Sequence, residues 1–480
     1  MNKNLVLIAL GAVAVVGAIL ALLIFAFKQK APDPEVDKIV IWGVWDESEV
    51  YDSFITEFKK THKNVKEIEY KKFACNKSEC LDYMEQVTQG LAAGAGPDIF
   101  MINNTWVPAH KDKMISLDSV NDELTKKEKP KIMNLREYGD AFFPVAKKDL
   151  TFKDADGVER IYGFPLYMDN LAVFYNRDLF SLAGMSPPPN NWTWQEFENK
   201  ILSFDAYVQK TTLIDDMGNI KKSGAAIGYG KNVSRAPDIL AVLMMQMGSP
   251  IVNEDWESVM DSQSASADGN SFSPGEAALD FFTKFSDRNQ AFYCWNKEMH
   301  HSIDAFTANE VGMMMNYSNQ IEIIKKKAPN INFGIAPLPQ ISNESKAVNF
   351  ASYWAFAVSK QATGQKAIEA FNFLKFLTEK AQAAKYAEAT GRVSARMDLA
   401  EAQKEDQWLG VFADQAISAT SFRQANNARI GVILENAINS IVDKGVPPAE
   451  ASQSASQLIS QEGYNIAQKL GGSNFNYDYK

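Results

Sequence analysis

The sequence predicts an α/β protein built as two lobes, and three observations lead to this fold class. First, the chain has 480 residues, more than one compact hydrophobic core usually serves. Second, short apolar runs of strand length alternate with amphipathic helical patterns through the first hundred residues. Third, residues 161–180 combine turn signals, a polar trio and a strand that is apolar on both faces. We expect the chain to cross between the lobes there.

The first segment of the chain predicts a membrane anchor. Residues 5–27 contain no charge and no proline, and a helix of about 23 residues spans roughly the 30 Å of a hydrocarbon core. A cleaved signal peptide is the alternative, but its apolar region is usually shorter, about 7–15 residues. Residues 25–30 are bulky and charged, so they offer no small-residue cleavage site, and no cysteine follows for a lipid anchor. Lysines flank the run on both sides, so charge does not fix its orientation.

The next part of the chain predicts a parallel α/β lobe. Three short apolar strands alternate with two amphipathic helices, and the second helix stops before Gly94, Gly96 and Pro97. Because ligands of such sheets bind beyond the carboxyl ends of the strands, the residues that follow the first and third strands are binding candidates. The expected elements are strands 38–42, 65–73 and 98–102, and helices from about Glu47 and over 81–91.

The middle of the chain predicts a hairpin and then a crossing. Asp156-Gly157 is a two-residue hairpin signal, because both residues can adopt positive φ. Tyr167, Asp169 and Asn170 interrupt the apolar run just before the strand at 171–176, and we expect them to present polar groups at the seam between the lobes. The alternative is an ordinary hairpin that is followed by a core strand.

Helix-capping signals mark the later elements. Thr193 with Glu196 predicts a capping box, and Ser273 with Glu276 repeats the pattern with a proline at the first helical position. Residues 261–273 between them are rich in serine, aspartate and glycine and predict a surface loop. Helical spacing of apolar residues returns from about Gln365 and again in the tail.

Charge and motifs exclude several classes of function. The net charge of −10 and pI of about 5.2 argue against nucleic-acid binding, which rests on clustered Lys and Arg. The chain has no Gly-x-Ser-x-Gly, His-Glu-x-x-His or phosphate-loop motif. Cys75 and Cys80 are predicted to form a local disulfide or to remain free thiols, as Cys294 does. Only four histidines are present and none has ligand spacing to these cysteines, so we expect no metal site and no cofactor.

Several motifs in a fixed order carry a resemblance to a known family. They are Lys38–Trp42, Gly94–Ile99, Tyr162–Pro165, Leu171–Phe180, Thr193–Glu196, Gly312–Tyr317, Asn349–Lys360 and Gly391–Arg396. Together they resemble the extracellular solute-binding proteins of family 1, the maltodextrin-binding-like receptors of ABC importers. The resemblance implies a periplasmic-binding-protein-like fold with crossing hinge strands. Its expected layout is an anchor and linker at 1–37, lobe I at 38–168 and 347–395, and lobe II at 169–346 and 396–480.

Aromatic residues dominate the candidate binding site. The chain has 9 Trp, and aromatic faces combined with Asp, Asn and Arg suit the C–H faces and hydroxyls of a sugar. The resemblance puts Asp169 at the family's acidic crossing position, and Trp42 and Trp106 near its aromatic sugar contacts. Glu47 and Tyr317 depart from the maltodextrin branch, which has a lysine and a tryptophan there. The candidates are Trp42, Trp45, Asp46, Asn104, Trp106, Tyr167, Asp169, Asn170, Tyr317, Trp354 and Arg392.

The sequence therefore predicts a membrane-tethered receptor with an extracellular or periplasmic body. We expect it to capture a small-molecule solute, with a sugar or oligosaccharide favoured, and to pass it to an ABC permease. Hinge closure around the ligand is the expected mechanism, and no catalytic residue is assigned. Two alternatives remain open, a surface glycoside hydrolase with a pair of carboxylates and a ligand-sensing subunit of a signalling system.

Overall fold

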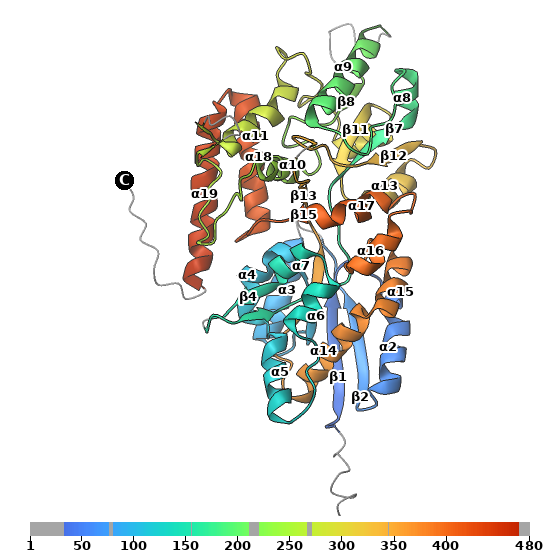
Figure 1. Ribbon diagram of the computed structural model, residues 1–480, viewed down its shortest axis with the longest axis vertical. Helices are drawn as coiled ribbons and strands as arrows, with labels where there is room; N and C mark the ends of the chain where they lie inside the picture. Colours follow the sequence, from blue (N-terminus) through green and yellow to red (C-terminus); the bar gives the residue numbers. More distant parts are fainter. Residues whose placement is uncertain are drawn as a thin grey trace, which may run out of the picture.

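Figure 1 shows the computed structural model, in which two lobes lie one above the other along the longest axis. The structure describes residues 33–75, 80–154, 156–210, 220–265, 271–343 and 345–469. The predicted anchor at residues 5–27 lies outside these ranges. Within them, no helix has both the length and the apolar composition that a membrane crossing requires.

The lower lobe in Figure 1, called here the first lobe, contains a five-stranded sheet. β1 pairs in parallel with β2 and β3, as the alternation of strands and helices predicts. β14 runs antiparallel between β3 and β6, so a strand from far along the sequence completes this sheet. The strands in sheet order are β2 (Val65–Lys72), β1 (Val36–Gly43), β3 (Ile99–Asn103), β14 (Trp354–Val358) and β6 (Phe164–Pro165).

The upper lobe, called the second lobe, contains a four-stranded sheet. β7 lies inside this sheet and is antiparallel to β11 and β12. All its residues are buried, which confirms the predicted strand with two covered faces. The strands in sheet order are β12 (Phe333–Ala336), β7 (Ala172–Asn176), β11 (Val311–Asn316) and β8 (Ser223–Ala225).

Helices pack against these sheets and against one another. In the first lobe α14 contacts β1, β14 and α2, and in the second lobe α10, α11, α18 and α19 contact one another. The first-lobe helices are α2 (Glu49–Thr61), α3 (Leu81–Ala92), α4 (Val107–His110), α5 (Leu117–Lys126), α6 (Leu135–Ala141), α7 (Pro144–Leu150), α14 (Gln365–Thr378) and α15 (Lys380–Thr390). The others are α8 (Arg177–Leu182), α9 (Trp194–Lys210), α10 (Ala236–Gln246), α11 (Pro274–Thr283), α12 (Ser302–Thr307), α13 (Gln320–Lys327), α16 (Met397–Gln403), α17 (Gly410–Gln415), α18 (Asn427–Lys444) and α19 (Pro448–Lys469).

The predicted helix caps are present. At the start of α9 the Glu196 carboxylate accepts from the Thr193 amide at 2.7 Å, and the Glu196 amide donates to the Thr193 hydroxyl at 3.3 Å. This reciprocal arrangement is the predicted capping box. The Ser273 hydroxyl accepts from the Glu276 amide at the start of α11, as expected.

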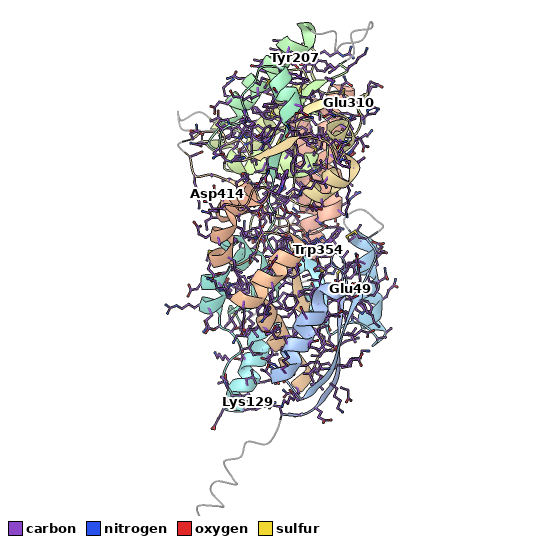
Figure 2. All side chains as sticks on the ribbon, turned by 90° about the vertical axis from the view of Figure 1, so that its right-hand side faces the viewer. Glu49, Lys129, Tyr207, Glu310, Trp354 and Asp414 are labelled. Atoms are coloured by element: carbon purple, nitrogen blue, oxygen red, sulfur yellow. A yellow bond between two sulfur atoms is a disulfide. The ribbon has the colours of Figure 1, made fainter. Side chains whose placement is uncertain are left out.

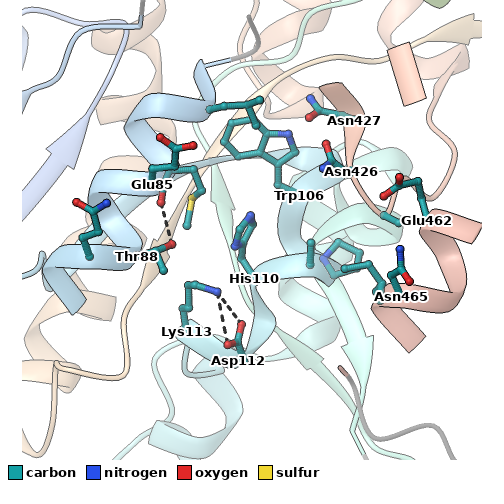
Figure 3. Close-up of a pocket in the computed structure, with 17 residues that line it drawn as sticks. Glu85, Thr88, Trp106, His110, Asp112, Lys113, Asn426, Asn427, Glu462 and Asn465 are labelled. Atoms are coloured by element: carbon teal, nitrogen blue, oxygen red, sulfur yellow. Dashed lines mark hydrogen bonds and ion pairs between the residues drawn. The ribbon is translucent and has the colours of Figure 1, made fainter. Parts of the chain in front are cut away.

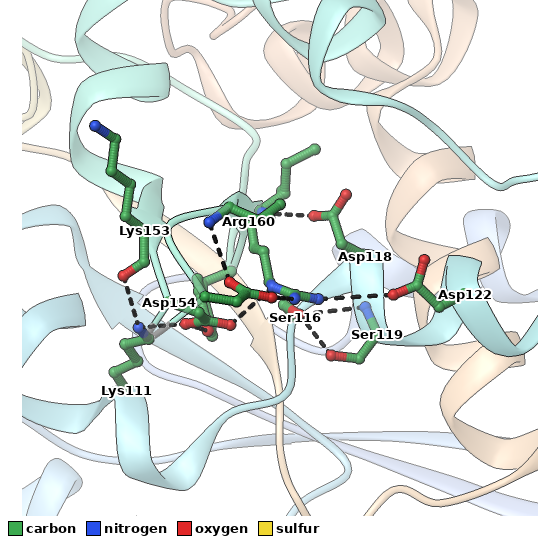
Figure 4. A network of polar contacts seen from close by, with 12 residues as sticks. Lys111, Ser116, Asp118, Ser119, Asp122, Lys153, Asp154 and Arg160 are labelled. Carbon is green, nitrogen blue, oxygen red and sulfur yellow. Dashed lines mark hydrogen bonds and ion pairs between the residues drawn. The ribbon is translucent and has the colours of Figure 1, made fainter.

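The predicted two-residue turn at Asp156-Gly157 is wrong. β4 (Thr151–Lys153) and β5 (Glu159–Ile161) do form an antiparallel hairpin, but residues 154–158 lie between the last pair of the ladder. Arg160 forms ion pairs with Asp154 and Asp156, and Lys111 pairs with Asp154 at 2.5 Å (Figure 4). These ion pairs and the bond from the Asp154 amide to the Val158 carbonyl favour the longer loop.

Three distant stretches of chain lie side by side at the seam between the lobes. Tyr167 forms an isolated bridge with Ser394, and Asn170 forms one with Ala351. Next to them β13 (Asn349–Phe350) pairs in parallel with β15 (Ala419–Thr420). The structure also joins Cys75 to Cys80 by a disulfide, one of the two alternatives expected, and leaves Cys294 free and buried.

Candidate ligand-binding site

Three tryptophans form a row where the strands of the first sheet end, called here the tryptophan row. Trp45 follows β1, Trp106 ends a short 3₁₀ helix after β3, and Trp354 opens β14. The Trp354 ring lies 5.6 Å from that of Trp45 and 5.0 Å from that of Trp106, both in edge-to-face geometry. Trp354 reaches this edge because β14 is antiparallel to β3 and pairs it with Asn103. Figure 2 places Trp354 at the waist of the molecule.

A cavity of about 720 Å³ opens beside Trp106, called here the first cavity. Its lining comes from α3 and α4 of the first lobe and from α18 and α19 of the second. Figure 3 shows Trp106 facing Asn426 and Asn427 across this space. Trp106 is only 4% exposed, and its indole nitrogen has no hydrogen-bond partner among the described residues. A buried donor without a partner costs free energy, which a ligand oxygen that reached it would offset.

A buried ion pair lies near the tryptophan row, called here the Asp46–Arg392 network. The Asp46 carboxylate is 3.0 Å from Nη1 of Arg392 and accepts hydrogen bonds from the hydroxyls of Tyr51 and Tyr386, both at 2.8 Å. The Arg392 guanidinium also stacks over the Tyr167 ring at 4.3 Å. Burial alone would lower the pKa of Arg392, but the facing oxygens of Tyr386, Tyr167 and Asp46 raise it overall. Arg392 therefore remains charged, and its charge is matched within the protein.

Asp169 holds the seam together rather than offering an open carboxylate. One carboxylate oxygen accepts from the amides of Asn170 and Ser318, and the other accepts from the Ser318 hydroxyl at 2.8 Å. Its backbone carbonyl accepts from the Ser352 amide. Burial raises the pKa of Asp169 to about 6, although the bonds from Ser318 act in the opposite direction. We expected this carboxylate to accept hydrogen bonds from a ligand, and that role stays a prediction.

Asn170 belongs to a cluster of buried amides at the same seam. Its side chain donates to the Phe412 carbonyl at 2.8 Å and accepts weakly from Asn349. Asn349 in turn donates to the Leu171 carbonyl and to the Gln415 side chain. We call Asn170, Asn349 and Gln415 the hinge amide cluster, because it ties the first crossing to the return strand and to α17.

The side chains of three further candidates contact residues outside the tryptophan row. Trp42 packs against Phe73 with ring centroids 4.4 Å apart, and α3 covers it through Gly90. The Asn104 amide donates to Asp149 at 2.7 Å and is buried. The Tyr317 hydroxyl donates to Asp238 in the second lobe. Ligand contacts of these residues stay predictions, because their polar groups or faces are already occupied by the protein.

The sequence reasoning missed the second-lobe side of the cavity. Asn426, Asn427, Glu462 and Asn465 line it, and Figure 3 shows them opposite Trp106. Glu462 also forms an ion pair with Arg429 at 3.4 Å. These residues follow no strand and match no motif, so only the packing of α18 and α19 brings them to the cleft.

The comparisons with known proteins assign the family. The model of the bacterial extracellular solute-binding protein family matches residues 53–412, three quarters of the chain. The chain belongs to this family. A protein of Brucella abortus (strain 2308), named only as a binding protein, is 24% identical over 393 residues, which are 78% of this chain and 82% of that protein.

Solved structures show the same two-lobe α/β fold. The cyclic α-maltosyl-1,6-maltose binding protein of Arthrobacter globiformis superposes with a TM-score of 0.69 at 16% identity, covering 90% of this chain and all of that one. The sugar-binding protein MalE of Xanthomonas citri gives 0.69 at 16% identity, with 91% and 100% covered. A Thermotoga lettingae ABC transporter solute-binding protein bound to α-D-tagatose gives 0.63 at 19% identity, with 89% and 100% covered. The predicted two-lobe fold is thus confirmed.

The chemistry of the site fits reversible binding. In the described residues, no group of three or more His, Cys, Asp or Glu side chains is arranged to hold a metal ion. The Trp106 ring and the amides of Asn426, Asn427 and Asn465 line a space between the two lobes, together with charged side chains on both sides of it. Aromatic faces, amides and charged groups of this kind bind polar molecules that carry C–H faces and hydroxyls.

Proposed function

We propose that this protein captures a carbohydrate in the first cavity and delivers it to an ABC permease. The observation that carries the proposal is Trp106, whose side chain lines a cavity formed by both lobes and whose buried indole N–H has no hydrogen-bond partner among the described residues. The family consists of extracellular solute-binding proteins. Proteins with the same fold include one bound to α-D-tagatose and a cyclic α-maltosyl-1,6-maltose binding protein.

The proposed mechanism is closure of the two lobes around the ligand. A ligand that touches α3 and Trp106 on one side and α18 and α19 on the other favours the closed form by its differential contacts. The hinge amide cluster and Asp169 lie where the chain crosses, so they fix the axis of this motion. We propose that residues 5–27 tether the body to the membrane outside the cell, near the permease.

The experiment is a calorimetric titration of the purified protein with maltotetraose and D-tagatose, after a thermal-shift screen of neutral sugars. We expect saturable binding by at least one sugar and its recovery without chemical change. Recovery of cleaved sugar would favour the hydrolase alternative instead. Absence of saturable binding by any neutral or acidic saccharide would contradict the proposal.

Two variants connect the binding to the cavity. Asn427→Ala and Asn465→Ala each remove an amide from the second-lobe side, and we expect either to weaken binding by about two- to tenfold. Gln457→Ala, about two helical turns before Asn465 on α19, exposed and outside the lining, is the matched control. Membrane fractionation of the full chain tests the tether, and recovery of the body in the soluble fraction with residues 5–27 removed would contradict it.

A further inference from the structure

A second cavity, of about 740 Å³, lies between the lobes next to the first cavity, and Pro108 of α4 lines both. Its lining includes Lys148 and Asp149 on α7 in the first lobe. The opposite lining comes from residues 248–254 after α10 and from residues 420–423, which lead into α18. The second cavity therefore also bridges the two lobes.

Other polar groups of the second cavity, the Asp149 carboxyl among them, are already engaged by the protein. Asp149 accepts hydrogen bonds from the side chains of Asn104, Tyr353 and Ser421. Burial raises the pKa of this carboxyl, while the donors around it have the opposite effect. The Ser249 hydroxyl accepts from the amide of Ile251 at 3.1 Å. A ligand thus finds few neutral groups in this cavity that are ready to bind it.

Two cationic side chains that line the cavity have N–H donors beyond those that bond to the described residues. The Lys148 ammonium has three donors and gives two, to the Ser421 carbonyl at 2.5 Å and to the Thr420 hydroxyl at 3.2 Å. The Arg423 guanidinium has five and gives one, to the Glu254 carbonyl at 2.7 Å. In the part of the chain that the structure describes, neither cation forms an ion pair with a carboxylate. The side chains of Lys148 and Glu254 are both exposed to solvent over part of their surface.

The two cations also act on each other. Burial lowers the pKa of the Lys148 ammonium, the buried Asp149 beside it has the opposite effect, and Arg423 lowers it further. Two like charges that line one partly enclosed space destabilise each other, and an anion between them would remove that cost. Carboxylate and sulfate oxygens accept several charge-assisted hydrogen bonds at once, which matches these additional N–H donors.

We propose that the second cavity binds the anionic group, a carboxylate or a sulfate ester, of an acidic saccharide, with Lys148 and Arg423 as its donors. This inference rests on the proposed function, because the sugar part of the same ligand would lie in the adjoining first cavity. Lys148 stands on the first lobe and Arg423 on the segment that enters the second. The bound anion therefore stabilises the closed form as well as selecting the ligand.

The test compares acidic saccharides with uncharged counterparts of nearly the same shape. Trigalacturonate is titrated against its methyl ester, and a sulfated disaccharide against its desulfated form, with calorimetric detection. We expect one of the acids to bind about ten- to a hundredfold more tightly than its counterpart, because charged hydrogen bonds are added. Which pair shows the preference identifies the anionic group as a carboxylate or a sulfate ester.

Two variants assign the preference to the cations. In Lys148→Gln and in Arg423→Gln we expect the acid to lose more affinity than its uncharged counterpart, so that each variant reduces the preference for the acid by the share of one charged donor. Lys147→Gln is the matched control, because Lys147 is the neighbour of Lys148 on α7 and does not line the second cavity. Melting curves of all three variants check that they fold, and each variant supplies the test independently of the other.

The outcomes separate this inference from the proposed function. Equal affinity for acid and counterpart, or an equal change of both in the variants or in the control, overturns the anion site and leaves sugar binding intact. If no saccharide binds, the proposed function fails, and thermal shift with inorganic sulfate decides the anion site alone. Stabilisation by sulfate that both variants lose supports the site, and its absence in the parent protein overturns it.

Discussion

The seam between the lobes has two regions that differ in how their polar groups are satisfied. In the paired region, the carboxylates of Asp46 and Asp169 and the hinge amide cluster bond to the protein itself. In the open region, the tryptophan row ends on a cavity with the indole N–H of Trp106 unpartnered. Asp169 and the hinge amide cluster hold the crossing in place, and the Asp46–Arg392 network holds elements together within the first lobe. The open region is where an added molecule gains hydrogen bonds.

The difference shows that residue type alone does not separate framework from site. Asp169 and Asn170 have the same donors and acceptors whether they hold a sugar or a neighbouring strand. Changes in the paired region should therefore alter stability, and changes in the open region should alter affinity. Measurements of stability and affinity in variants of both regions test this division.

The largest effect is expected when the chain is cut at the first crossing. A fragment of residues 38–169 lacks β14, which lies between β3 and β6, and lacks α14, which packs on that sheet. The exposed apolar strands should prevent cooperative folding and cause aggregation. Circular dichroism during urea unfolding measures this. A soluble fragment with a cooperative transition would contradict the proposed discontinuous layout of the lobes.

Asp46→Ala should have the next largest effect, on stability. It leaves Arg392 in a mostly buried place without its carboxylate, and losing one partner of such a pair costs about 3 kcal/mol. Urea unfolding gives the free energy directly. Asp140→Ala is the matched control, because it removes an exposed ion pair with Arg136 and should cost less than about 1 kcal/mol. If both variants lost the same free energy of unfolding, the Asp46 ion pair would not stabilise the protein as proposed.

The stability of the paired region should depend on pH through Asp169. Its pKa is about 6 in the folded protein and 3.8 for the free side chain, so the folded state holds this proton more tightly. The free energy of unfolding therefore falls as pH rises from about 4 to about 6, by up to about 3 kcal/mol for this group. Asp169→Asn should remove that slope. Unfolding at pH 4, 5, 6 and 7 measures it, and a rise in the Asp169 contribution over this range would contradict the burial argument.

The sequence predicts the features that depend on local signals and misses those that depend on packing between distant elements. The parallel strands of the first lobe, the buried strand β7 and the helix caps could be predicted, because periodicity and capping are local signals. The tryptophans after β1 and β3 could be found because parallel strands end at one edge. The facing side could not, since Asn426 and Glu462 reach the cleft only through the packing of α18 and α19. Nor could the partners of Asp46, which include Tyr386 from far along the chain.

The smallest predicted effect is a loss of affinity in a variant of the open region. Trp106→Phe keeps an aromatic ring and removes the unpartnered N–H, so affinity for the saccharide should fall by up to about tenfold. Trp192→Phe is the control, because its N–H donates to the Pro337 carbonyl inside the second lobe. That variant should lower the melting temperature and keep the affinity. The reverse pattern would place the site elsewhere.

The central claim is that a saccharide bridges the two lobes in the first cavity. Amide hydrogen exchange with and without a saturating saccharide tests it most directly, because exchange reports protection segment by segment. We predict slower exchange at residues 107–113 in the first lobe and at residues 425–430 at the start of α18, in the same experiment. Protection on one lobe alone, or at neither segment while the saccharide is bound, would contradict the claim.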